Sequence, residues 1–267
     1  MEYILYIGLG AAAGLISGLF GLGGGVIIVP ILIFAFDAQG ISPQISTHLA
    51  IATSLACIIV ISFSSIFTHQ QKGAICWSLV RWITPGIIIG TLVGSLLAVS
   101  LSGFLLQLAF GIFLILVATQ MLFYKTVTVD RSQPEKITLI LAGSGIGAIS
   151  ALFGIGGGSL TVPFLTRTGT KMHQAVGSAA ACGLPIAMVA AIIYGSADIT
   201  GKHLPDPSLG YIYLPAWLGI VVASMPSARA GALMAHRLNE RFLKQSFALL
   251  LLVVGTRFIW INIANQL

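Results

Sequence analysis

The chain has 267 residues, of which 57% are apolar and 7% are charged, and its mean hydropathy is +1.02. A soluble domain carries about 25% charged residues, so this composition excludes a water-soluble globular protein and predicts a multi-pass protein of the lipid bilayer. The net charge of +6 does not indicate a nucleic-acid partner, because the cations are few and scattered between apolar segments. Orientation in the membrane explains them better.

Ten apolar stretches follow one another along the chain and predict an all-α fold. They cover 3–20, 24–36, 48–68, 78–98 and 103–124 in the first half, and 137–153, 157–166, 173–195, 209–235 and 243–263 in the second. A polar linker at 125–136 separates a first membrane repeat at 1–124 from a second at 137–267. Each repeat is expected to hold transmembrane helices plus one glycine-rich broken helix or hairpin, which gives about eight spans and about ten helical segments in all.

A glycine-rich motif occurs twice, at Ser17–Leu32 and at Ser150–Leu165, with ten of sixteen positions identical. Residues 3–36 as a single helix would be about 50 Å long, too long for a bilayer core of about 30 Å, so the chain is expected to fold back at the glycines. Paired interruptions at corresponding places in two halves indicate a transport site. The glycines concerned are Gly21, Gly23, Gly24 and Gly25 in the first copy and Gly154, Gly156, Gly157 and Gly158 in the second.

These glycine elements are predicted to bind an anion. Non-helical backbone at membrane depth is stable only when it is buried in protein or lines a wet cavity, and glycine permits the positive φ of a sharp turn. The helix that starts after each turn presents free N–H groups and the positive end of its dipole, and Pro30 and Pro163 are expected to act as hinges. The alternative, close helix packing, better explains Gly90, Gly94 and most glycines of 8–18.

The loop charges predict the orientation of the chain. With simple crossings throughout, the cations divide evenly between the two sides, so no orientation is specified. When each glycine element is a return, all but Lys202 share one side, as the positive-inside rule requires. These cations are Lys72, Lys125, Arg131, Lys136, Arg167, Lys171, Arg237, Arg241 and Lys244. The two repeats are therefore expected to be inverted, with both termini outside and the linker in the cytoplasm.

Hydroxyl side chains follow each glycine element in a second duplicated patch. Thr53 and Ser54 of the first copy, and Ser178 of the second, are predicted to contact a ligand near the midplane. The alternative is a hydroxyl that bonds back to its own helix carbonyl. Arg257 lies past the middle of the last stretch with no acidic residue near it in sequence, so it is a candidate charge partner of an anion, with snorkelling to the surface as the alternative.

The same patch pairs His48 with His173 and Cys57 with Cys182. Both histidines begin their helices, so interfacial, solvated side chains are a better interpretation than proton carriers. Both cysteines are expected to be buried apolar filler, with a soft contact to a sulfur substrate as the alternative. We predict no catalytic residue, metal or cofactor, since the chain has no HExxH motif and no carboxylate pair.

At these residues the chain resembles the sulfite exporter TauE/SafE family, also called the toluene sulfonate uptake permease family. The resemblance covers nearly the whole chain and rests on the Phe-Gly-x-Gly-Gly-Gly…Val-Pro motif at 20–30 and 153–163, each followed by the histidine and hydroxyl patch. It implies a carrier of sulfite or small organosulfonates in a bacterial or archaeal inner membrane. It does not specify the substrate, the direction or a coupling ion.

The sequence therefore predicts a secondary transporter that moves a small sulfur-containing anion by alternating access. Export is the preferred direction. One alternative is a passive anion channel. The other is an intramembrane enzyme in which His173 or His48 activates Ser178. Proton coupling and the oligomeric state, a homodimer included, are left open.

Overall fold

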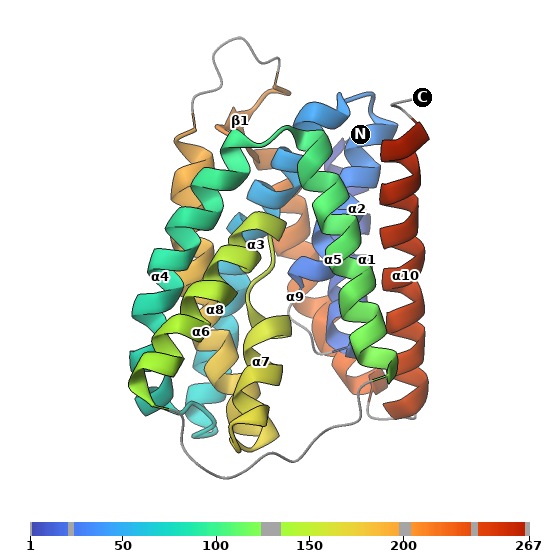
Figure 1. Cartoon of the computed structure of the whole chain (residues 1–267). Helices are drawn as coiled ribbons and strands as arrows, with labels where there is room; N and C mark the ends of the chain where they lie inside the picture. The colour runs from blue at the N-terminus through green and yellow to red at the C-terminus, as the bar shows by residue number, and fades with distance from the viewer. Residues whose placement is uncertain (1, 21–23, 124–134, 198–203, 236–239, 265–267) are drawn as a thin grey trace.

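The computed structural model describes residues 2–20, 24–123, 135–197, 204–235 and 240–264. Within these ranges the chain forms ten helices and one short hairpin (Figure 1). The helices of the first half are α1 (Glu2–Phe20), α2 (Gly25–Ala38), α3 (Pro43–Gln71), α4 (Trp77–Ser100) and α5 (Gly103–Phe123). Those of the second half are α6 (Lys136–Phe153), α7 (Gly158–Arg167), α8 (Met172–Gly195), α9 (Leu214–Ala235) and α10 (Glu240–Ala264). The hairpin pairs β1 (Ser208–Leu209) with β2 (Ile212–Tyr213) just before α9.

The all-α membrane fold predicted from composition is confirmed, and each predicted apolar stretch corresponds to one helix. Among the described residues, six helices are long and apolar enough to cross a bilayer: α3, α4, α5, α6, α8 and the Gln245–Ile263 part of α10. The described apolar runs of α1, α2 and α9 are shorter. The clearest difference lies at 209–235, where the β-hairpin replaces the first residues of the expected helix.

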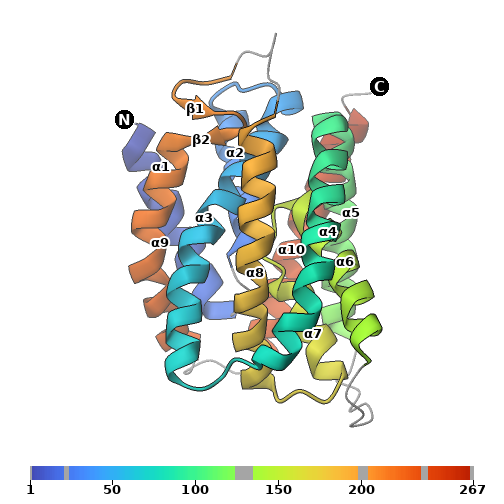
Figure 2. The same ribbon diagram turned by 90° about the vertical axis from the view of Figure 1, so that its left-hand side faces the viewer.

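The four most extensive helix contacts map onto one another when the two halves are exchanged. The most extensive contacts join α1 to α9, α4 to α6, α5 to α10 and α3 to α8. If α1–α5 are matched in order with α6–α10, the α1–α9 pair becomes α6–α4, while α3–α8 and α5–α10 map onto themselves. Figures 1 and 2 show α1 starting at the end of the bundle where both termini lie and α6 starting at the opposite end. Two oppositely oriented repeats would produce this arrangement.

Small residues let two of these helix pairs approach closely, because backbone can touch backbone where no Cβ intervenes. A Cβ built on Gly90 of α4 would meet the carbonyl oxygen of Ser144 of α6. In α1, a Cβ on Gly14 would lie 2.5 Å from the carbonyl oxygen of Ser224 of α9. The packing interpretation is confirmed for Gly90 and Gly14. It does not apply to Gly8, whose Cβ would meet no atom within 4 Å among the described residues.

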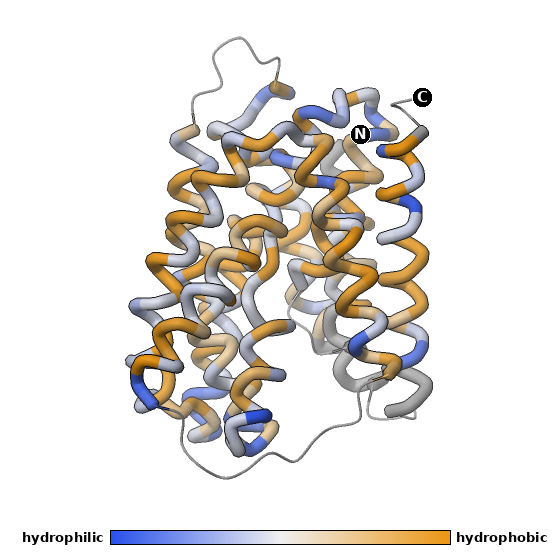
Figure 3. Tube along the Cα trace, viewed as in Figure 1, coloured by the Kyte–Doolittle hydropathy of each residue, from blue (hydrophilic) through white to orange (hydrophobic). Residues whose placement is uncertain are grey.

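Hydrophobic residues predominate along the length of the bundle, and hydrophilic residues are more frequent at its two ends (Figure 3). Phe67, Leu96, Leu116, Leu141 and Val253 are each more than half exposed. In water such a surface would be unfavourable, whereas lipid tails solvate it.

The described cations of the loops gather at the end of the bundle opposite the termini. Lys72 follows α3, Lys136 begins α6, and Arg167 and Lys171 flank the turn between α7 and α8. Figure 1 shows these helix ends together at the bottom of the view. Lys125, Arg131, Lys202 and Arg237 lie outside the described residues. The four described cations therefore lie together, as the return-element arrangement requires.

Candidate functional site

The second glycine motif interrupts a helix, as predicted. Between the end of α6 and the start of α7, Gly154 and Gly157 are both left-handed, with φ of 69° and 73°. This conformation costs an L-residue with a side chain about 1–2 kcal/mol, so the turn depends on glycine. The helix then restarts at Gly158.

The first glycine motif also separates two helices. α1 ends at Phe20 and α2 begins at Gly25. Gly24, the residue before α2, is buried and has a φ of 26°. Gly21 and Gly23 lie outside the described residues. The predicted interruption is therefore confirmed at both copies of the motif.

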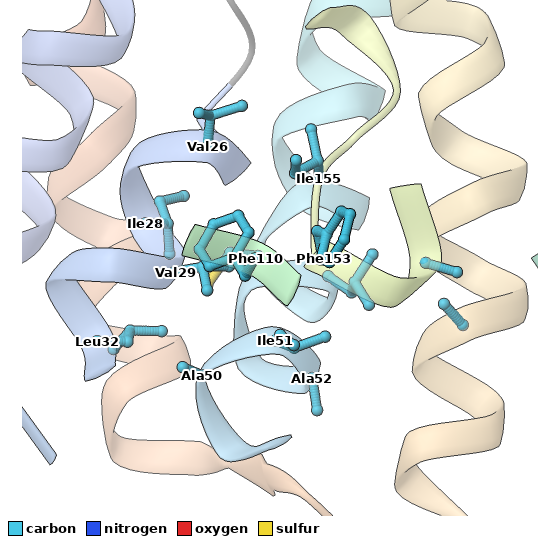
Figure 4. Close-up of a cluster of buried hydrophobic side chains, with 14 of the residues drawn as sticks. Val26, Ile28, Val29, Leu32, Ala50, Ile51, Ala52, Phe110, Phe153 and Ile155 are labelled. Atoms are coloured by element: carbon cyan, nitrogen blue, oxygen red, sulfur yellow. The ribbon is translucent and has the colours of Figure 1, made fainter. Parts of the chain in front are cut away.

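The two breaks meet inside the bundle. A Cβ built on Gly25 would lie 2.6 Å from the carbonyl oxygen of Gly154 and 2.9 Å from the Cα of Ile155. Both are backbone atoms, so neither can turn aside as a flexible side chain can. Figure 4 shows Val26 and Ile155 on the two sides of this contact, within a cluster of buried apolar side chains. Two segments far apart in the sequence thus form one structural element.

Helix α3 runs past the second break and holds it in place. The Ser54 hydroxyl donates a hydrogen bond to the Gly154 carbonyl at 2.9 Å. Ile51 packs against Gly154, and Ile58 packs against Gly156. The position of the second-half break is therefore set by a helix of the first half.

Each helix that follows a break begins with N–H groups that the helix itself does not use. In α7, the N–H of Thr161 donates to the Gly157 carbonyl at 2.7 Å, and in α2 the N–H of Ile28 donates to the Gly24 carbonyl at 2.9 Å. The N–H groups of the first two residues of each helix come before these bonds and have no acceptor within the helix. Together with the positive end of the helix dipole, they favour a negatively charged ligand.

A proline interrupts both helices at the same place, one turn beyond the break. Pro30 lies inside α2 and Pro163 inside α7, each at the sixth residue of its helix. Proline has no N–H to donate to the carbonyl four residues before it. Both helices are consequently short of one hydrogen bond just beyond the turn.

The structure directs the three predicted hydroxyls to different segments. All three are fully buried. Ser54 contacts the second break, as described above. Thr53 accepts a hydrogen bond from the N–H of Tyr213 at 3.0 Å, and Ser178 accepts one from the N–H of Cys76 at 2.9 Å. All three therefore bond across the bundle to another segment.

His48 is not the solvated residue that the sequence predicted. Its side chain is 2% exposed, and its ring nitrogens lie 3.2 Å from the carbonyl oxygen of Gln44 and 3.0 Å from that of Ala98. The ring also stacks on Tyr211. The prediction is wrong for His48 because the chain beyond α4 and the hairpin before α9 cover the start of α3. His173, at the start of α8, is exposed as expected.

The structure does not align a histidine with Ser178. The Ser178 hydroxyl is bound by the α3–α4 loop at one end of the bundle, whereas His48 lies near the start of α3 at the other end. Within the described residues, no bond between His173 and Ser178 is formed. Cys57 and Cys182 are both fully buried thiols, which is the environment expected for filler.

Arg257 has a partner that its sequence neighbours do not reveal. Its guanidinium lies 5.1 Å from the centroid of the Phe34 ring. It also attracts the carboxylate of Asp37, which accepts a hydrogen bond from Ser46 at 3.0 Å. The side chain of Arg257 is exposed and lies beside the far half of α2. The structure therefore does not bring it to the glycine breaks.

Three hydroxyls that the sequence analysis did not single out surround the second break. Ser150 and Thr161 are fully buried, and a Cβ built on Gly157 would lie 3.5 Å from the Thr161 Oγ1 and 3.7 Å from the Ser150 Oγ. Within the described part of the chain, neither hydroxyl nor that of Ser159 has a hydrogen-bond partner. An unpartnered buried polar group costs about 1–3 kcal/mol, so these positions call for an explanation.

The repeat itself contained the signal for these residues. At a constant offset of 133, Ser159 and Thr161 of the second copy replace Val26 and Ile28 of the first. Hydroxyl residues stand in one copy of the turn where apolar residues stand in the other. This difference indicates that the two copies have different chemical roles.

Two cavities approach this region from opposite ends of the bundle. A cavity of about 350 Å³ reaches Gly24 and Ile28 at the first break, and its lining continues to Thr68 and His69 near the end of α3. A larger cavity of about 830 Å³ lies at the end where the termini are, and its lining includes His48. Only the first cavity includes residues of a glycine break.

Comparisons with known proteins agree with this architecture. A probable membrane transporter protein of Haemophilus influenzae is 34% identical over 253 residues, covering 94% of this chain and 96% of the relative. One of Methanocaldococcus jannaschii is 31% identical over 264 residues, covering 94% and 93%. One of Bacillus subtilis is 24% identical over 283 residues, covering 97% and 98%. No solved structure matches the chain significantly.

The helical bundle and these relatives define a multi-pass membrane transporter. The sequence model of the family described as sulfite exporter TauE/SafE matches residues 6–258. The chain belongs to this family.

Proposed function

We propose that the chain is a secondary transporter that exports sulfite or small organosulfonate anions by alternating access, with the anion held where the two glycine breaks meet. The observation that carries the proposal is the backbone contact of Gly25 with Gly154 and Ile155. The start of α2 lies against the turn that leads into α7. Unused N–H groups at the start of a helix suit an oxyanion.

The side chains that surround the breaks are uncharged. The neighbours of Gly25 and Gly154 are Val29, Ile51, Ile58 and the second-break backbone. A carrier must release its substrate as well as bind it, and neutral donors hold an anion less tightly than a buried, fully desolvated cation does. Backbone N–H groups and hydroxyls therefore fit a transport site better than a permanent ion pair would.

One cavity leads from an end of the bundle to the first break. It is lined by Gly24 and runs toward the end of α3, where Lys72 and the other described loop cations lie. By the positive-inside rule we take this end to face the cytoplasm and both termini to face outside. The described conformation then gives the first break access from the cytoplasm, the side from which an exporter takes up its substrate, while the cavity at the other end is lined by His48 and by no residue of a glycine break.

Alternating access follows if the two inverted halves rock around the meeting point. The α1–α9 and α4–α6 pairs, which map onto each other when the halves are exchanged, provide two equivalent interfaces along which the halves would slide. Pro30 and Pro163 supply hinges at equivalent places, because each leaves its helix one hydrogen bond short beyond the turn.

The experiment is sulfite transport by the purified protein in proteoliposomes. Uptake of radiolabelled sulfite should saturate, and unlabelled sulfite inside the vesicles should accelerate it, because a carrier exchanges its substrate across the membrane. Uptake that rises linearly with concentration and shows no counterflow would identify a passive anion channel instead.

A binding panel tests the substrate class separately. Sulfite and methanesulfonate should raise the thermal midpoint of the purified protein, since a ligand that binds only the folded state stabilises it by mass action. Acetate serves as the carboxylate control and should give a smaller shift. Stabilisation by carboxylates alone would contradict the sulfur assignment.

A further inference from the structure

We infer that the anion binds to the second break rather than equally to both, through the hydroxyls of Ser150 and Thr161 and the first N–H groups of α7, and that its binding group carries three oxygens, as –SO₃ does. This inference rests on the proposed function and specifies its site. Ser150 lies in the last turn of α6, and Thr161 lies in the first turn of α7. The turn at Gly154–Gly157 folds these two helix ends onto each other.

The two hydroxyls are free to donate, unlike comparable hydroxyls elsewhere in the chain. Thr84 bonds back to the carbonyl of Val80 at 2.7 Å, and Ser144 bonds back to that of Ile140 at 3.1 Å. This back-bonding is the usual fate of a hydroxyl in a helix. Thr161 and Ser150 do not follow it: both are fully buried and neither side-chain oxygen has a partner within the described residues.

Both hydroxyls point at the N-terminal end of α7. Gly157 is the residue that caps this helix, and a Cβ built on it would lie 3.5 Å from the Thr161 Oγ1 and 3.7 Å from the Ser150 Oγ. The same Cβ would lie 2.6 Å from the Ile186 Cδ1, so a side chain at this position would have to displace Ile186. The left-handed φ of Gly157 also requires glycine.

The surrounding carbonyls favour an anion over a cation at this place. A cation would need unpaired carbonyl oxygens, but three carbonyls at the end of α6 and the start of the turn already accept hydrogen bonds. The Ser150 carbonyl accepts from the N–H of Ile155 at 2.9 Å, the Ala151 carbonyl from the Tyr194 hydroxyl at 3.1 Å, and the Gly154 carbonyl from Ser54 at 2.9 Å.

The carbonyl of Ser159 points away from the site. Pro163 has no N–H to donate to it, but carbonyls of a helix point toward its C-terminal end, away from the Gly157 cap. The groups near the cap that can meet an anion are four donors: two hydroxyls and the N–H groups of Gly158 and Ser159. Four donors can serve the three oxygens of a sulfite or sulfonate group, because each oxygen accepts more than one hydrogen bond.

The first break shares only part of this donor set. Ser17, whose side chain lies outside the described residues, occupies the position of Ser150. Val26 and Ile28 occupy the positions of Ser159 and Thr161, and both are buried apolar side chains. The cavity from the cytoplasmic end reaches Gly24 and Ile28. The first break is thus an apolar wall on the path of the anion, and the hydroxyls that bind it lie beyond that wall and are closed off from solvent in this conformation.

The test is isothermal titration of the purified full-length protein with sulfite, repeated with methanesulfonate. Ser150→Ala and Thr161→Val each remove one donor to a charged ligand, so each should weaken binding about ten- to hundredfold. Thr161→Ser keeps the hydroxyl and should keep wild-type affinity. If the Thr161→Val protein does not fold, Ser150→Ala alone provides the test, because it removes a single atom from a fully buried site.

Matched controls come from α4. Ser95 and Thr91 are also fully buried and also lack partners within the described residues, so Ser95→Ala and Thr91→Val repeat the same chemical changes away from the break and should leave affinity unchanged. Wild-type affinity in Ser150→Ala and Thr161→Val overturns the inference and leaves the proposed function intact. A wild-type protein that binds neither sulfite nor methanesulfonate overturns both.

Discussion

The two glycine breaks share a backbone plan but differ in the side chains around it. Both place a positive-φ glycine immediately before a new helix, and both are followed by a proline at the sixth helical residue. Around the first break, Val26 and Ile28 are buried apolar residues. Around the second, the hydroxyl residues Ser159 and Thr161 stand at the equivalent positions.

The difference shows that two copies of one motif can keep the same backbone turn and change the side chains after it. The two turns need each other, since Gly25 lies against the backbone of Gly154 and Ile155. At the two positions where the copies differ in this way, the second carries hydroxyl donors and the first carries apolar side chains. A pair of breaks with one backbone plan therefore does not require a symmetric binding site: one break can form the wall and the other the ligand contacts.

The largest effect is expected where the two breaks touch. In Gly25→Ala, the new methyl group would meet backbone atoms of the second break, so the breaks must separate, at a cost of about 3 kcal/mol. The thermal midpoint should fall and transport should be lost. Gly145→Ala is the control, because a Cβ on Gly145 meets no described atom within 4 Å, and alanine is the better helix former by about 1 kcal/mol. Equal midpoints for the two variants would contradict the contact.

The next effect concerns the bond that ties the second break to the first half. Ser54→Ala leaves the buried Gly154 carbonyl without its donor, which should cost about 1–3 kcal/mol. Ser95→Ala removes a buried hydroxyl that has no partner in the described residues, so it relieves an unfavourable burial and should not lower stability. Thermal midpoints measured without anion compare the two. A larger loss in Ser95→Ala would show that the Ser54 bond is not formed.

A smaller effect is expected when a hydroxyl is added to the first break. Val26→Thr places a polar group among apolar side chains, which should lower stability by about 1–2 kcal/mol. Sulfite affinity should not rise, because the anion is bound at the second break. Titration with sulfite measures this directly. Tighter binding by Val26→Thr would mean that the anion contacts both breaks.

The smallest effect is expected at Arg257. Its side chain is exposed and lies over Phe34, and an exposed cation–π contact contributes about 0.5–1 kcal/mol. Arg257→Gln should therefore lower the thermal midpoint slightly. Sulfite affinity should stay within about twofold of wild type, which is a smaller change than the loss of one hydrogen bond to the anion would cause. A tenfold loss of affinity would restore Arg257 as a ligand of the anion.

The sequence predicted the helices well: each predicted apolar stretch corresponds to one helix. It also predicted both breaks, since Gly154 and Gly157 require a left-handed backbone. It failed at 209–235, where an apolar run containing Tyr211 and Tyr213 forms part of a hairpin. Apolar composition does not distinguish a short buried strand from a helix start.

The details of the site depend on contacts that the sequence does not contain. His48 is buried because the carbonyl of Ala98, fifty residues away, lies against its ring. Arg257 finds Asp37 only because α10 packs beside α2. The role of Ser150 depends on a turn that folds it back onto Gly157. In each case, the determining partner comes from another element.

The most direct test of the account is to locate the anion. Selenite has the shape and charge of sulfite, and its selenium scatters anomalously, so crystals of the full-length protein grown with selenite would show its position. The account predicts one peak inside the bundle, within hydrogen-bonding distance of the Ser150 and Thr161 hydroxyls and the first N–H groups of α7. A peak in the cavity beside His48, or equal peaks at both breaks, would contradict it.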